Sequence, residues 1–98
     1  MQYIIEAEMP EVLSENLMDL IPDDLEKVQQ LMSEQVIYSY SMSADQKRVW
    51  VLIEAEDEEE VEDIMRGLEI TEHLHYEIHE LAFMQQSSSF NIPSFSLN

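Results

Sequence analysis

The 98-residue sequence contains no cysteine. Disulfide frameworks, thiolate nucleophiles and zinc–thiolate sites are therefore excluded, and the absence fits a reducing compartment. The single glycine, Gly67, rules out both common glycine-rich phosphate-binding loops. No apolar run approaches the roughly 18 residues of a membrane-spanning helix, and the N-terminus lacks the basic start of a signal peptide. We therefore expect a cytoplasmic protein with no membrane partner.

Basic residues are also scarce. Four Lys and Arg stand against 22 Asp and Glu, which gives a formal net charge of −18 and a pI near 4.1. Binding a nucleic-acid backbone requires cationic groups that displace counterions, so nucleic acid is not an expected partner. Anionic membrane surfaces are disfavoured for the same reason. The simplest interpretation of the acidity is a well-solvated, self-repelling surface.

Hydrophobic residues, at 45% of the chain, predict a globular domain with a modest core. Strand-forming runs occupy 3–8, 36–42, 48–55 and 74–83, and a polar turn at 43–47 joins the middle two. Apolar residues at helical spacing predict a helical segment from Glu11 to Met32, with a break at Ile21–Pro22. A second helix should start at Asp57, with Glu60 completing a capping pair, and stop near Gly67.

The resulting order, strand–helix–strand–strand–helix–strand, predicts an α+β fold of the ferredoxin-like type with a four-stranded antiparallel sheet. Right-handed crossovers place both helices on one face of that sheet and leave the other face uncovered. We expect this domain to span 1–84. Residues 85–98 form a C-terminal tail in which Phe90, Ile92, Phe95 and Leu97 are apolar. Two interpretations of the tail stay open: a disordered terminus, or an arm packed on a neighbouring subunit.

Strict alternation assigns the side chains of each strand to one of the two faces. Val49, Val51, Ile53 and Ala55 should meet the helices. The opposite face should carry Ile4, Glu6, Glu8, Trp50, Leu52, Glu54, His73, His75, Glu77, His79 and Leu81. Such a mixed face is typical of a sheet on which a second sheet stacks, with a tryptophan as a natural interface anchor. We therefore predict a homodimer or a larger oligomer.

The polar residues of this face are the candidate site. We expect Glu6, Trp50, Glu54 and Glu77 to line a ligand-binding cleft, in which a small organic molecule is the expected ligand. His75 or His79 beside the carboxylates is a candidate proton carrier for acid–base chemistry. A weaker alternative is metal binding by His73, His75, Glu77 and His79, since imidazoles at alternate strand positions can chelate one ion. No cofactor is predicted.

Four stretches of the sequence together resemble the muconolactone isomerase-like group of dimeric α/β-barrel proteins. They are Leu20-Ile21-Pro22, the run from Ser39 to Val51, the run from Ala55 to Val61, and the closing run from Tyr76 to Phe83. The resemblance covers about 1–84 and implies ferredoxin-like protomers whose open sheets pair face to face as a dimeric barrel. It also implies a small-molecule cleft beside that barrel and, for the isomerases, proton transfer on a lactone. The alternative is a non-catalytic interaction module whose polar face only fixes the register between subunits.

Overall fold

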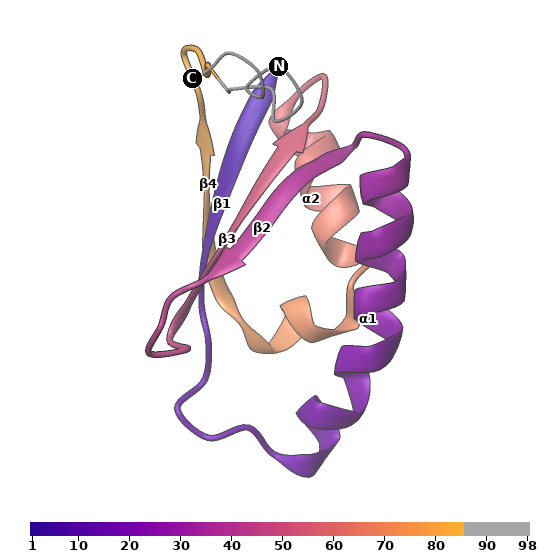
Figure 1. The fold of residues 1–98 in the computed structure, drawn as a ribbon, viewed down its shortest axis with the longest axis vertical. Helices are drawn as coiled ribbons and strands as arrows, with labels where there is room; N and C mark the ends of the chain where they lie inside the picture. Colours follow the sequence, from indigo (N-terminus) through magenta and orange to yellow (C-terminus); the bar gives the residue numbers. More distant parts are fainter. Residues whose placement is uncertain (86–98) are drawn as a thin grey trace, which may run out of the picture.

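The structure is a computed structural model and describes residues 1–85. Its elements are β1 (Gln2–Glu8), α1 (Glu15–Ser33), β2 (Ile37–Met42), β3 (Arg48–Glu54), α2 (Glu58–Arg66), the short 3₁₀ helix η1 (Glu69–His73) and β4 (His75–Glu80). All strand pairs are antiparallel, in the order β2-β3-β1-β4. Both helices lie on the same side of the sheet (Figure 1). The predicted ferredoxin-like α+β fold is confirmed.

Side-chain caps fix where the two helices begin. The Ser14 hydroxyl accepts from the Leu17 N–H at 3.2 Å and starts α1, and the Asp57 carboxylate accepts from the Glu60 N–H at 2.8 Å and starts α2. Each cap satisfies one of the backbone donors that the first turn leaves unpaired. Helix α2 begins and ends where the sequence predicted, with Gly67 as its C-cap. The start of α1 was predicted four residues too early, because the chain enters the helix only at the Ser14 cap.

The predicted break at Ile21–Pro22 is wrong. Helix α1 is 19 residues long and continues through Pro22 without a break. A proline inside a helix removes one backbone hydrogen bond and crowds the carbonyl four residues earlier, which costs about 3 kcal/mol. Tertiary contacts on both sides offset that cost here, since Leu17 before the proline and Asp24 after it are both buried. Packing has therefore overridden the local signal.

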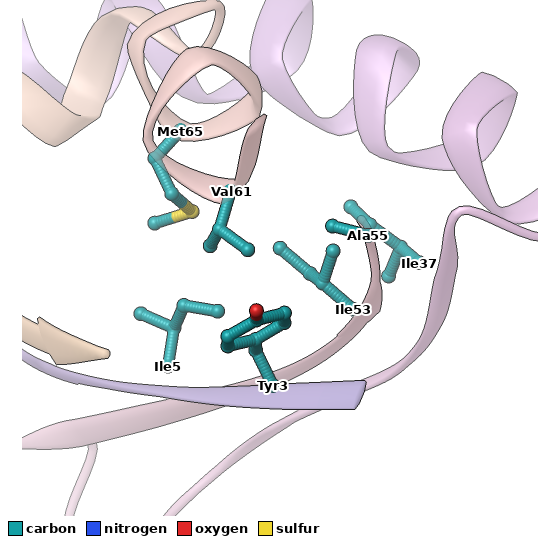
Figure 2. Packing of buried hydrophobic residues seen from close by; sticks show 7 residues of the cluster. All are labelled: Tyr3, Ile5, Ile37, Ile53, Ala55, Val61 and Met65. Carbon is teal, nitrogen blue, oxygen red and sulfur yellow. The ribbon is translucent and has the colours of Figure 1, made fainter. Parts of the chain in front are cut away.

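The core lies between the helices and the sheet face that they cover. Figure 2 shows Val61 and Met65 of α2 pointing toward Tyr3 and Ile5 of β1. The cluster contains Tyr3, Ile5, Ile37, Ile53, Ala55, Val61 and Met65. Burial raises the pKa of the Tyr3 phenol above its ordinary value, and the negative charges of Glu80, Asp57 and Glu58 act in the same direction. Val51, Ile53 and Ala55 belong to this core or pack against it, as the alternation predicted, whereas Val49 is not one of its residues.

The last strand is shorter than the predicted 74–83, because a 3₁₀ helix precedes it. The buried Asp24 carboxylate of α1 accepts from the Glu69 and Ile70 N–H groups at 2.9 and 2.8 Å, which anchors the start of η1. The Thr71 hydroxyl is 2.7 Å from the carbonyls of Met65 and Leu68. These bonds hold the chain in a tight turn up to His73, so β4 begins only at His75.

Neither helix in residues 1–85 combines the length and the apolarity that a membrane-spanning helix needs. The predicted tail, apart from Gln85, lies outside the described residues.

Candidate functional site

The sheet has a second face, turned away from both helices, which we call the open face (Figure 1). Strand register places its side chains in rows across the sheet. One row holds Ser39, Leu52, Ile4 and His79, and the next holds Ser41, Trp50, Glu6 and Glu77. A third row holds Arg48, Glu8 and His75. Four of the six residues predicted for the site, Glu6, Trp50, Glu77 and His79, therefore lie in two adjacent rows.

Ion pairs connect the polar side chains of these rows. The Arg48 guanidinium donates to the Glu6 carboxylate at 2.8 Å. The His79 Nε2 lies 3.9 Å from the other oxygen of Glu6 and 3.4 Å from a carboxylate oxygen of Glu77. We call Arg48, Glu6, His79 and Glu77 the polar network. Its imidazole has carboxylates on two sides, the arrangement in which a histidine can exchange a proton.

The network is open to solvent in the single protomer. The side chain of Glu6 is 35% exposed, and those of Arg48 and His79 are about half exposed. Ion pairs at this exposure are screened by water and contribute little to stability, with a typical value of about 0–1 kcal/mol. The network therefore needs a covering partner before its charges can act strongly on a substrate or on each other.

Next to the network lies an apolar strip made of Ile4, Trp50 and Leu52. Leu52 is only 5% exposed, while Ile4 and Trp50 are half-buried. Register joins Leu52 directly to Ile4, and Trp50 precedes Leu52 by two residues on the same strand face. Both helices pack on the other side of the sheet, and Leu52 is already buried within the protomer, so the accessible apolar surface of the strip belongs to Ile4 and Trp50. An apolar centre with a polar rim is the usual anatomy of a protein–protein interface.

Two of the predicted residues lie apart from the network. Glu54 pairs in register with Gln2, four residues along β3 from Trp50, which corresponds to about 13 Å. Its carboxylate is 2.5 Å from the Met1 ammonium instead. The expected convergence of Glu54 with Glu6 is therefore wrong. His75 is on the open face as predicted, beside Glu8 in the outer row.

The proposed row of four metal ligands is not formed as predicted, because His73 belongs to η1 rather than to β4. Among residues 1–85, no three His, Asp or Glu side chains gather closely enough to hold a metal ion.

A separate cleft of about 620 Å³ lies where the β2–β3 hairpin meets the segment that follows β1. It is lined by Glu8, Met9, Pro10, Glu11, Leu13, Met42, Asp45, Gln46, Lys47 and Arg48. The Met9 N–H donates to the Lys47 carbonyl at 2.8 Å, and this bond holds the two walls together. The predicted cleft residues Glu6, Trp50, Glu54 and Glu77 are not part of this lining, although Arg48 joins the cleft to the polar network.

The hairpin wall of the cleft is fixed by Asp45. Its carboxylate accepts from the Ser43 hydroxyl at 2.6 Å and from the Lys47 N–H at 3.0 Å. The bond from Ser43, and then the one from Lys47, hold the pKa of Asp45 below its ordinary value, so this carboxylate stays charged. Gln46 adopts a left-handed backbone conformation (φ 63°) that completes the turn. Within residues 1–85 the Lys47 ammonium makes no ion pair, which leaves it available to a ligand.

Two features were not predicted from the sequence, Arg48 and the hairpin cleft. Alternation with Trp50 places Arg48 on the open face, but only the folded structure brings its guanidinium to Glu6. The cleft could not be found, because its second wall, residues 9–13, was assigned partly to a helix.

No protein-family model matches this chain, and no curated protein matches it at a significant level. The resemblance to the muconolactone isomerase-like group therefore stays a prediction.

Proposed function

We propose that this protein is a homodimeric, small-molecule-binding protein of the dimeric α/β-barrel type, in which two protomers stack their open faces. The observation that supports it best is the pair of half-buried apolar residues Ile4 and Trp50, which lie on the open face beside the polar network. Stacking a second sheet would remove this apolar surface from water and shield the ion pairs of the network.

Charge favours a second copy as the covering partner. The open face carries four of the 22 acidic residues, Glu6, Glu8, Glu54 and Glu77, together with one of the four Lys and Arg and two of the three histidines. Most of the remaining surface is strongly acidic, so two copies approaching through it would repel each other. The open face, with four acids, one arginine and two histidines, has a smaller excess of acids than α2, which carries five acids and one arginine.

The oligomeric state tests the first half of the proposal. Trp50→Glu adds a charge at the centre of the open face and should convert the dimer into monomers, as measured by native mass spectrometry and light scattering. Met18→Glu is a matched control, because Met18 is 54% exposed on α1 and lies far from the open face. A wild-type protein that is monomeric at micromolar concentration contradicts the proposal.

The cleft beside the hairpin supports the second half. Its volume lies within the usual range for small-molecule sites, roughly 300–1,000 Å³. Met9, Leu13 and Met42 offer an apolar wall and Lys47 offers a cation, which suits a small molecule with an apolar body and an acidic or carbonyl group. We infer that lactones and their open-chain acids belong to the ligand class.

Ligand binding can be measured directly. A panel of small lactones and the corresponding organic acids should include compounds that raise the melting temperature of the wild-type protein and shift amide NMR signals of the hairpin. Leu13→Trp, which fills the cleft, should abolish both effects while the dimer persists. Equal responses from the wild type and the Leu13→Trp variant would place the ligand elsewhere.

A second candidate function is isomerase-like proton transfer, which the position of His79 between two carboxylates favours. In the stacked dimer, His79 would accept a proton from a carbon next to a carbonyl and return it to another position of the same molecule. The test is deuterium incorporation from heavy water into panel compounds, followed by NMR. His79→Asn should remove the exchange, His75→Asn should reduce it less, and exchange that survives in His79→Asn contradicts the assignment.

A further inference from the structure

Helix α1 presents a second apolar side to solvent along its N-terminal half. Met18 is 54% exposed and Leu25 is 44% exposed, and Pro22 between them is exposed as well. These residues recur at i, i+4 and i+7, so they form one stripe along the helix, which we call the outer stripe. The buried residues of α1, Leu17 and Asp24, each precede a member of the stripe by one position and point elsewhere. The outer stripe is therefore separate from the side of α1 that packs within the protomer.

The exposed apolar residues of the protomer gather in this region. Among residues 1–85, nine large hydrophobic residues are exposed, and four of them, Val12, Leu13, Met18 and Leu25, fall between 12 and 25. Single apolar residues scattered over a surface need no explanation, but several in one region mark an interaction site. Side chains at this helical spacing form a ridge against which a second helix packs.

An acidic stripe borders the outer stripe. Glu15 and Asp19 lie three residues before Met18 and Pro22, and Glu26 lies four residues after Pro22. Residues three or four positions apart are neighbours on a helix surface. The carboxylates of the acidic stripe are all exposed, and within residues 1–85 none of them makes an ion pair. Their charges are therefore free to attract the cationic groups of a partner.

No basic residue offsets the acidic stripe. The sequence contains no Lys, Arg or His before Lys27, and the Lys27 ammonium donates to the Gly67 carbonyl at 3.0 Å, next to the end of α2. A second copy that docked through its own outer stripe would bring acids against acids, and like charges across an interface cost several kcal/mol. Anionic lipids and nucleic acids are repelled for the same reason. The charge of this surface therefore favours a cationic partner.

We propose that this side of α1 binds a basic amphipathic helix of a partner protein. The apolar face of that helix covers the outer stripe, and its lysines and arginines lie against the acidic stripe. Because proline has no N–H, the Met18 carbonyl lacks the helical donor that residue 22 would supply, and a basic side chain of the partner can donate to it. Helix α1 and the open face lie on opposite sides of the sheet, so this docking leaves the proposed dimer and its barrel intact (Figure 1).

The binding test uses a synthetic Leu–Lys peptide of about 18 residues, with all leucines on one helical face and a fluorescent label. Fluorescence anisotropy at physiological ionic strength should show binding of this peptide to the wild-type protein at micromolar concentration. A scrambled peptide of the same composition should bind about tenfold more weakly or less, because it carries the same charge but cannot present a continuous apolar face.

Two variants separate docking from unspecific attraction to an acidic protein. Met18→Glu and Leu25→Glu each add a negative charge while removing apolar surface, so docking predicts about tenfold weaker binding, whereas unspecific attraction predicts tighter binding. Asn16→Glu is the matched control. It adds the same charge to α1 at an exposed position two residues before Met18, on a different side of the helix, and should bind the peptide at least as tightly as the wild type.

A second measurement does not depend on the folding of any variant. Adding the peptide to the wild-type protein should shift amide NMR signals at 15–26, and shifts confined to the open face or to the hairpin cleft would overturn the proposal. Unchanged or tighter binding in Met18→Glu and Leu25→Glu would overturn it as well, as would equal affinities for the two peptides or no binding of the amphipathic one. A smaller oligomer of Leu25→Glu in native mass spectrometry would show that the outer stripe contacts a second copy instead.

Discussion

The two faces of the sheet are made from alternate residues of the same strands, yet their environments differ sharply. On β1, Ile5 is 0% exposed beneath the helices, while Ile4, its neighbour in sequence, is half-buried on the open face. On β3, Ile53 is buried against the helix-side core, and Glu54 beside it reaches solvent. The covered face is almost entirely apolar, and the open face mixes an apolar strip with a network of charges.

This difference shows that the two faces serve different purposes. The covered face is packed within the protomer at its centre, where Val61 and Met65 of α2 lie against Tyr3, Ile5 and Ile53. The open face combines the half-buried apolar residues Ile4 and Trp50 with more ionisable groups than a finished core contains. A second protomer stacked on the open face would bury its apolar residues and shield its charged groups from water. The difference between the two faces can be tested by substitution.

The largest effect should come from substituting the same residue type on each face. Ile5→Ala leaves a cavity in the core and should lower the free energy of unfolding by about 2–5 kcal/mol. Ile4→Ala removes the same atoms from the open face and should cost only about 1 kcal/mol in the monomeric Trp50→Glu background. Urea unfolding of both variants checks the difference. Equal losses in that monomeric background would show that the two faces are not distinct.

The next effect concerns the contact that positions η1 and, through it, the start of β4. Asp24→Ala leaves the Glu69 and Ile70 N–H groups without an acceptor and should destabilise the protein by about 1–3 kcal/mol. Hydrogen exchange should locate the loss at 69–73. The neighbouring Asp23→Ala, at an exposed position, should change stability by less than about 0.5 kcal/mol. A comparable loss in both variants would contradict the role given to Asp24.

The smallest effect should appear at the hairpin where both faces end. The pKa of Asp45 is lower in the folded state than in the unfolded chain. The charged Asp45 therefore stabilises the fold above the ordinary pKa of an aspartate, and this stabilisation is lost as the pH falls through the lowered value. Asp45→Asn should therefore lower stability slightly at neutral pH and flatten the acid limb of the unfolding profile. Asp19→Asn, on the exposed side of α1, is the control, and an unchanged acid limb in Asp45→Asn would refute the prediction.

Much of the fold could be predicted because its signals are local. The alternation in β1 and β3, the Asp57 cap and the polar turn at 43–47 specify strands, a helix start and a hairpin from neighbouring residues alone. The passage of α1 through Pro22 and the turn before β4 could not be predicted, because they depend on contacts between residues far apart in the chain, such as Asp24 with Glu69. The start of α1 is set by a local signal, the Ser14 cap, which the prediction missed.

The candidate site divides in the same way. Alternation alone assigned Glu6, Trp50, Glu77 and His79 to one face, because side-chain direction in a strand has a period of two. Only the tertiary structure decided their neighbours: strand register brought Arg48 to Glu6 and left Glu54 at the far end of the sheet, and η1 removed His73 from the row. The hairpin cleft is likewise a tertiary feature, because its walls come from segments that meet only after the sheet has formed. The sequence by itself determined which residues share a face, and the pairing of distant strands determined which of them touch.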